Sequence, residues 1–176
     1  MRGTDQKQFA RILGVDPSTR GFGFVVIEAN GRPVDWGIKE LTARGKRVDK
    51  ELLWRLDPII DRYDPVLIAL EDCRDGARGD RALRMINTIA GHAALLDKKR
   101  ELLSRDELRA VLGLQGTATK HDIASKVAEC LPALGGYLPP KRKLGDSESE
   151  RMNIFDAAAL ALAAMLLRFP DSATAY

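Results

Sequence analysis

The chain has 176 residues, which suits one compact domain with a substantial core and leaves little room for two. Its 28 basic and 25 acidic residues give a formal charge of +3, so a nucleic-acid interface must come from the distribution of charge rather than from its total. A hydrophobic fraction of 45% argues against a disordered or collagen-like chain.

The first part of the chain predicts an antiparallel meander of three strands. Residues 11–15 form a short apolar run that ends at an Asp-Pro pair, which is typical of a buried strand. Residues 21–28 are rich in β-branched and aromatic side chains, and the Asn30-Gly31 pair after them is a strong hairpin signal. Residues 33–41 alternate apolar and polar side chains and return as the third strand.

The middle of the chain predicts a helix, a buried strand and a second helix. Residues 46–63 carry apolar side chains at helical spacing, although Pro58 should kink or shorten this helix. Residues 65–70 form a continuous apolar run, typical of a strand buried on both faces, and Glu71 follows it directly. After a polar loop, residues 82–99 have the pattern of an amphipathic helix.

The last part of the chain is predicted to be mainly helical. Residues 101–103 could form a short edge strand, and residues 105–112 a helical turn. Apolar spacing predicts a helix over residues 120–131, followed by a Gly- and Pro-containing linker that ends at Ser147. We expect the final helix to begin at Ser147, because Glu150 three residues later completes a capping box.

This order of elements predicts an α/β fold, in which a mixed sheet carries helices on both faces. The sheet would combine the antiparallel meander with parallel strands. Residues 1–9 lack the apolar core of a signal peptide, so we interpret residues 1–10 as a polar tail. We expect residues 11–170 to form a single domain and residues 171–176 a C-terminal tail.

The use of cysteine and histidine suits a protein of a reducing cellular compartment. Cys73 and Cys130 have no disulfide-framework spacing, and two histidines are too few for a typical Cys/His zinc site. The most apolar stretch, residues 154–169, includes Asp156 and is too short to span a bilayer comfortably. We therefore expect a cytoplasmic protein that has no membrane partner.

Three acidic residues stand at the edges of hydrophobic segments. Asp16 ends the first predicted strand, Glu71 ends the fourth, and Asp156 lies where the last helix becomes almost wholly apolar. A buried carboxylate is costly unless it binds a cation. Because adjacent strands lie about 5 Å apart, Asp16 and Glu71 could share a cation if their strands are neighbours. A helix packed across that end of the sheet would supply Asp156.

Oxygen ligands of this kind select Mg²⁺ or Mn²⁺ rather than zinc. Two such ions roughly 4 Å apart would activate water and stabilise the leaving oxygen in phosphodiester hydrolysis. Asn153, three residues before Asp156, faces the same way and is a further candidate ligand, although a surface helix position is its more ordinary role. Singly, each acid also suits a structural role in a turn or a solvated strand end. Together they predict a metal-dependent nuclease.

Two runs of basic residues flank these acids in the sequence. One run follows Glu71, and the other precedes the last helix. A charge run is usually a solvated face, but these positions favour contacts with phosphate groups. The candidate DNA-binding residues are Arg74, Arg78, Arg81, Arg84, Lys141, Arg142 and Lys143.

Three motifs occur in an order and at a spacing that resemble a known family. They are DPSTRGFGF (residues 16–24), VLIALE (residues 66–71) and NIFDAAALALA (residues 153–163). Over roughly residues 11–169, the chain resembles the RuvC-type Holliday-junction resolvases of the RNase H-like superfamily. The resemblance implies an RNase H-like fold with a five-stranded mixed sheet.

The same resemblance implies the site and the partner. Asp16, Glu71 and Asp156 would be metal ligands, with two Mg²⁺ or Mn²⁺ ions in each active site. The segment TKHDIASKVAECLP is similar to the family's stretch before the last helix, and Lys120 matches a lysine that contributes to phosphate binding and catalysis there. The protein would act as a homodimer on branched DNA, with the helix over residues 82–99 in the dimer interface.

The chain departs from the family pattern at two places. The family carries an acid or a histidine at the position of Asn153, and an amide supplies no charge and cannot act as a base. Members commonly have an aromatic residue shortly after the second acid, where the nearest candidate here is Arg74. An arginine can stack on a base or bind phosphate.

The function expected from these features is divalent-metal-dependent cleavage of four-way (Holliday) DNA junctions in recombination and repair. Two alternatives remain open. The first is a nuclease of the same fold that acts on other branched DNA or on hybrids. The second is a junction-binding protein whose catalysis is impaired by the amide at Asn153.

Overall fold

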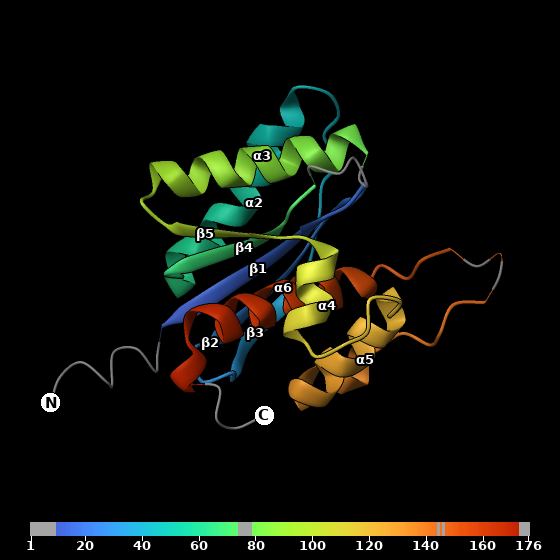
Figure 1. Cartoon of the computed structure of the whole chain (residues 1–176). Helices are drawn as coiled ribbons and strands as arrows, with labels where there is room; N and C mark the ends of the chain where they lie inside the picture. Colours follow the sequence, from blue (N-terminus) through green and yellow to red (C-terminus); the bar gives the residue numbers. More distant parts are fainter. Residues whose placement is uncertain (1–9, 74–78, 144, 146, 173–176) are drawn as a thin grey trace, which may run out of the picture.

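The computed structural model describes residues 10–73, 79–143, 145 and 147–172. A five-stranded sheet with the order β3-β2-β1-β4-β5 forms its centre (Figure 1). β1, β2 and β3 make the antiparallel meander, β4 is parallel to β1, and β5 is parallel to β4. The predicted α/β class and mixed sheet are therefore confirmed. The strands are β1 (Arg11–Pro17), β2 (Gly21–Glu28), β3 (Pro33–Glu40), β4 (Leu67–Glu71) and β5 (Lys99–Leu103).

Helices cover both faces of the sheet, as predicted (Figure 1). α2 and α3 pack on one face, whereas α4, α5 and α6 pack on the other. The helices are α2 (Arg47–Tyr63), α3 (Asp80–Leu95), α4 (Arg105–Val111), α5 (Lys120–Cys130) and α6 (Met152–Arg168), with short 3₁₀ turns η1 (Pro132–Tyr137) and η2 (Pro170–Ser172).

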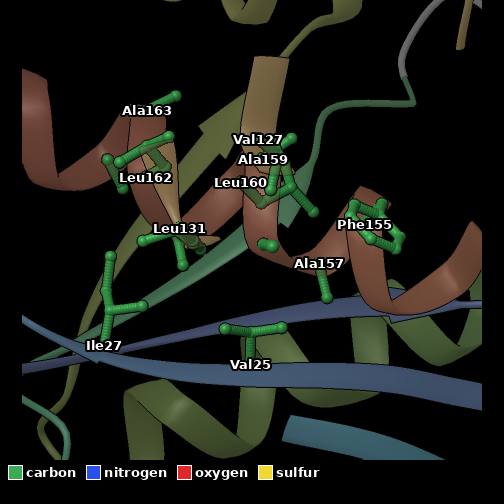
Figure 2. Close-up of a cluster of buried hydrophobic side chains, with 14 of the residues drawn as sticks. Val25, Ile27, Val127, Leu131, Phe155, Ala157, Ala159, Leu160, Leu162 and Ala163 are labelled. Carbon is green, nitrogen blue, oxygen red and sulfur yellow. The ribbon is translucent and has the colours of Figure 1, made fainter. Parts of the chain in front are cut away.

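The two hydrophobic layers are built by alternate residues of the same strands, because successive side chains of a strand point to opposite faces. Val25 and Ile27 of β2 belong to the layer beneath α6, whereas Phe24 and Val26 belong to the layer beneath α2 and α3. Figure 2 shows Val25 and Ile27 facing α6, with Ala157 of that helix on the side nearest the sheet. The core of the protein is thus divided by its central sheet.

α6 approaches the sheet at backbone distance because two glycines face it. A Cβ atom added to Gly14 of β1 would lie 2.0 Å from the carbonyl oxygen of Ala157, and one added to Gly23 of β2 would lie 2.2 Å from that of Asn153. Both distances are far too short for a non-bonded contact, so only glycine fits at these positions. The start of α6 is thereby fixed above β1 and β2.

Some predicted boundaries differ from those observed. α2 continues through Pro58 to Tyr63, so this proline does not shorten the helix. α3 ends at Leu95, and Asp97 beyond it adopts a left-handed conformation with φ of 54°. β5 begins at Lys99 rather than at residue 101, because it pairs with β4 along the whole length of that strand.

The predicted start of the last helix is wrong. α6 begins at Met152 rather than at Ser147, and its N-cap residue Arg151 makes no side-chain capping bond. Glu150, the expected partner in the capping box, instead accepts a hydrogen bond of 2.6 Å from Nη1 of Arg20. A long-range ion pair has therefore replaced the local contact that the sequence indicated.

Most of the predicted tails, residues 1–9 and 173–176, lie outside the described residues. None of the helices in the described part of the chain combines the length and the apolarity needed to cross a membrane.

Candidate active site

Two of the three candidate acids end neighbouring parallel strands. The register of β1 and β4 pairs Leu13 with Ile68 and Gly14 with Ala69. Continued to the ends of the strands, this register sets Asp16 beside Glu71. Both carboxylates are buried, with 1% of Asp16 and 5% of Glu71 exposed, so their charges need compensation within the protein.

The third acid is brought to the same place by α6. Asp16 pairs across the sheet with Gly23, and the backbone of Asn153 in the first turn of α6 packs on Gly23. Asp156 lies one turn further along the helix. As a result, Asp16, Glu71 and Asp156 line a single small pocket, although they come from three separate parts of the chain.

The wall of this pocket combines apolar and cationic side chains. Leu108 of α4, Ile123 of α5 and Leu160 of α6 supply apolar surface, which excludes water from one side of the acids. The basic residues Arg105 and Lys120 also line the pocket. The described residues thus give the pocket three carboxylates and two cations within a largely apolar surround.

Each cation is bonded to one of the acids. Nε of Arg105 donates to Oε1 of Glu71 at 3.0 Å, and Nζ of Lys120 donates to Oδ2 of Asp156 at 2.8 Å. Lys120 also donates to Oε1 of Glu148 at 2.8 Å. These bonds compensate the charges of Glu71 and Asp156.

The charge state of Lys120 follows from the same contacts. Burial disfavours the ammonium and would lower the pKa of Lys120. The charge of Asp156 and the hydrogen bonds to Asp156 and Glu148 outweigh that effect, so the pKa lies above its ordinary value. Lys120 is therefore a cation at neutral pH, beside a carboxylate and at the edge of the pocket.

The donor chemistry of the pocket fits a hard divalent cation, because its acids offer only oxygen atoms. In the arrangement observed, however, no group of three or more His, Cys, Asp or Glu residues among those described is gathered at metal-binding distances. Glu71 and Asp156 are instead engaged by Arg105 and Lys120. A divalent ion bound at Glu71 or Asp156 would therefore lie close to one of these cations.

Asn153 is not among the residues that line the pocket. Its side-chain amide donates to Oγ of Ser18 at 3.1 Å, which links the first turn of α6 to the turn after β1. The amide thus has a structural partner beside the site, and its role as a metal ligand stays a prediction.

The predicted basic residues divide into three groups. Arg74 and Arg78 lie outside the described residues. Arg81 donates two hydrogen bonds to the carbonyl oxygen of Ala43, at 3.1 and 3.2 Å, and Arg84 pairs with Asp49 through Nε at 3.0 Å. Both arginines therefore hold α3 against the segment before and within α2.

The third group lies beside the pocket. Lys141 and Arg142 line a groove with a volume of about 550 Å³, between the start of α5 and the chain that leads to α6. Lys143 follows them and is exposed. Lys120 lines both this groove and the acidic pocket, so the two are continuous at that residue.

No pattern in the sequence indicated that Arg105 or Glu148 would belong to the site. The register of β4 and β5 pairs Glu71 with Leu103, which places Arg105 two residues beyond the partner of Glu71. A basic residue just after a strand is too common a pattern to identify such a contact. Knowledge that β5 lies parallel to β4 would have been needed.

Comparisons with known proteins bear on the fold. No protein-family model matches the sequence, and no curated protein matches it. The structure is similar to that of Thermus thermophilus RuvC, with a TM-score of 0.68 and 17% identity over 91% of this chain and 96% of that chain. The yeast mitochondrial Holliday junction resolvase is similar with a TM-score of 0.61 and 15% identity, over 96% of this chain and 82% of that chain.

The fowlpox virus Holliday junction resolvase is also similar, with a TM-score of 0.53 and 16% identity over 88% of this chain and 96% of that chain. All three likenesses extend over most of both chains, so they concern the whole domain rather than a local motif. The RNase H-like fold expected from the three sequence motifs is confirmed. This chain has the fold of the RuvC-type Holliday junction resolvases.

Proposed function

We propose that the protein is a divalent-metal-dependent, structure-specific DNA endonuclease that resolves four-way junctions by paired phosphodiester hydrolysis. The observation that carries this proposal is the convergence of Asp16, Glu71 and Asp156 on one pocket. Two buried acids at strand ends and a partly buried acid on a helix are hard to explain structurally, because removing a carboxylate from water costs free energy. The likeness of the fold to solved junction resolvases supports the same function.

In this proposal, Asp16, Glu71 and Asp156 hold Mg²⁺ or Mn²⁺. Bound there as a pair, such ions supply an activated water and stabilise the leaving oxygen. Lys120 holds a proton and presents its positive charge at the boundary between pocket and groove. That position suits an ammonium that stabilises negative charge on the attacked phosphate.

The groove beside the pocket would bind the DNA backbone. Lys141 and Arg142 line it, and their charges favour phosphate groups without selecting a base sequence. A strand whose scissile phosphate lay at the acids would pass Lys120 and continue along the groove. Arg81 and Arg84 contribute less in this scheme, because each already bonds to a partner within the protein.

Paired cleavage requires two active sites that face a single junction, so we propose a homodimer. α3 exposes Leu83 at 38% and Leu95 at 85%, which leaves apolar surface on this helix for a second copy. The T. thermophilus RuvC and fowlpox virus resolvase structures include complexes with Holliday junction DNA. Branched DNA is accordingly the proposed partner of this chain.

A second candidate function is binding of junctions without cleavage. It is favoured by Asn153, which supplies no charge and already bonds to Ser18. The two ion pairs that engage Glu71 and Asp156 favour it as well. Under this alternative, the basic groove would retain its role and the acidic pocket would hold no catalytic ion.

One experiment separates these candidates. The purified protein is incubated with a labelled synthetic four-way junction in Mg²⁺, in Mn²⁺ and in EDTA, and both nicks are mapped. A flap, a replication fork, an RNA–DNA hybrid and a linear duplex serve as competing substrates. Symmetric nicks that need the metal support a resolvase, and preferred cleavage of another substrate would identify a different nuclease. Tight junction binding with no cleavage in either metal would reject the leading proposal.

A further inference from the structure

Arg105 occupies a position from which it can act on the acidic pocket. It is the first residue of α4 and lies directly beyond β5, the strand that pairs with the one carrying Glu71. Its Nε atom donates to Oε1 of Glu71 at 3.0 Å, and its side chain is 40% exposed. One side of the guanidinium therefore contacts a buried acid while another faces solvent at the edge of the pocket.

The helix that carries Arg105 is held firmly in place. Ser104 caps it with a complete capping box, in which the Ser104 side chain accepts from the backbone of Glu107 at 3.2 Å and Glu107 accepts from the backbone of Ser104 at 2.8 Å. Leu108 is buried against the core, and Nε of Arg109 donates to the carbonyl oxygen of Ala118 at 3.0 Å. The guanidinium of Arg105 can therefore change partners by side-chain rotation while the backbone of α4 stays fixed.

The two cations of the pocket differ in how they are held. Lys120 bridges two carboxylates, those of Asp156 and Glu148, and only the first of these lines the pocket. If Asp156 turned to a metal ion, Lys120 would keep its bond to Glu148. Arg105 pairs with Glu71 itself, so a divalent ion at Glu71 would meet a positive charge already bonded to the same carboxylate.

We propose that Arg105 is a positioning residue that exchanges partners when metal binds, moving from Glu71 to a phosphate of the DNA. Without metal, its guanidinium holds the Glu71 carboxylate in the pocket and lowers the repulsion among the three acids. When a divalent ion takes Glu71, the guanidinium is released at the edge of the pocket, where a phosphate can accept its two parallel hydrogen bonds. This inference rests on the proposed function, because it takes the acids to be the metal ligands.

The exchange couples two binding events. Metal that displaces Arg105 frees a cation for DNA, and DNA that binds Arg105 frees Glu71 for metal. Each ligand should therefore raise the affinity for the other by the same factor. If Arg105 had a merely structural role, its loss would disorder Glu71 and weaken metal binding. The partner exchange predicts instead that its loss strengthens metal binding in the absence of DNA.

The test uses Mn²⁺ as the probe. Electron paramagnetic resonance measures the binding of Mn²⁺ to the full chain, with and without a four-way junction. Arg105→Gln should bind Mn²⁺ about fivefold or more tightly than the wild type when no DNA is present. Its junction affinity in Ca²⁺ should fall, and the increase in Mn²⁺ affinity caused by the junction should shrink. Arg105→Lys keeps the charge, so its Mn²⁺ affinity should lie between those of the wild type and Arg105→Gln.

Arg168→Gln is the matched control, because Arg168 makes the same kind of Nε bond to Glu101, at 2.6 Å, and does not line the pocket. It should leave Mn²⁺ affinity unchanged, and thermal unfolding verifies that every variant is folded. Unchanged or weaker Mn²⁺ binding by folded Arg105→Gln or Arg105→Lys would overturn the partner exchange while leaving the nuclease proposal intact. A wild-type protein that binds no Mn²⁺ would overturn both.

Discussion

Nζ of Lys120 lies 2.8 Å from Oδ2 of Asp156, so the first residue of α5 is bonded to an acid near the start of α6. The two helices meet at this ion pair beside the ends of β1 and β4. The pairing joins a candidate metal ligand to a residue of the basic groove. It therefore ties the two parts of the proposed site together.

Replacing Lys120 by alanine should lower turnover more than junction affinity. The ammonium stabilises charge that grows on the phosphate as the bond breaks, and loss of one such group costs on the order of 100-fold in rate. Single-turnover cleavage and equilibrium binding measure the two effects separately. Lys126→Ala, at an exposed lysine of the same helix that pairs with Glu129, is the control. Equal losses of rate and affinity would reduce Lys120 to a phosphate clamp.

The substitutions Asp16→Asn, Glu71→Gln and Asp156→Asn should each abolish cleavage while junction binding survives. Each keeps the size of the side chain and removes the charge that a divalent ion requires. Binding is measured in Ca²⁺ and cleavage in Mg²⁺ and Mn²⁺. Asp106→Asn, at an acid whose side chain is 89% exposed, should behave as the wild type. Normal cleavage by any of the three pocket variants would exclude that residue from the metal site.

A methyl group at Gly14 should destabilise the protein by overpacking the contact between β1 and α6. The added Cβ atom would lie 2.0 Å from the carbonyl oxygen of Ala157, so α6 must move. We expect Gly14→Ala to lower the free energy of unfolding by about 1–3 kcal/mol, as measured by urea denaturation.

Gly91→Ala is the matched control for that substitution, because a Cβ atom at Gly91 in α3 meets nothing within 4 Å. The free energy of unfolding of the Gly91→Ala variant should rise by about 0.5–1 kcal/mol, since alanine is a better helix former than glycine. If both variants lost stability alike, the close approach of α6 would not be the cause.

Acid should destabilise the protein in part through Glu28, whose side chain is 3% exposed. The hydrogen bonds from Arg32 are the main cause that holds the pKa of Glu28 below its ordinary value of 4.5, against the opposing effect of burial. A carboxyl with a lowered folded-state pKa contributes stability above its unfolded pKa and loses it as pH falls through the folded pKa. Stability should therefore decline below about pH 4.5.

Arg32→Gln should lower the free energy of unfolding at pH 7 and flatten its decline in acid, because the pKa of Glu28 would then be lowered less. Urea denaturation between pH 3 and 7 measures both effects. Arg44→Gln, at an exposed arginine, should change neither. An unaltered pH profile for Arg32→Gln would show that the Glu28 pair does not control acid stability.

The meander and the buried fourth strand were predictable because their signals are local. Asn30-Gly31 indicates a hairpin without reference to the rest of the chain, and an unbroken apolar run indicates a strand covered on both faces. Asp16 and Glu71 stood out for the same reason, since a carboxylate next to such a run is visible in a few residues. Their adjacency was conditional on the first and fourth strands being neighbours, which the pairing of β1 with β4 shows.

Other features depend on contacts between distant segments. The pairing of Arg105 with Glu71 requires the register of β5 against β4, and the pairing of Arg84 with Asp49 requires the packing of α3 on α2. Local preference was also overridden at Glu150, where a bond to Arg20 replaced the expected capping box. These are interactions between side chains that become neighbours only when the sheet assembles.

The division of the core by the sheet has a consequence for engineering this domain. Along β1, Ile12 and Gly14 face α6, whereas Leu13 and Val15 face the layer of α2 and α3. By the same alternation, Asp16 faces α6. The three acids thus meet on one side of the sheet, the side that α6 covers. The opposite layer can be redesigned, shortened or grafted with new surface loops while the geometry of the three acids is kept.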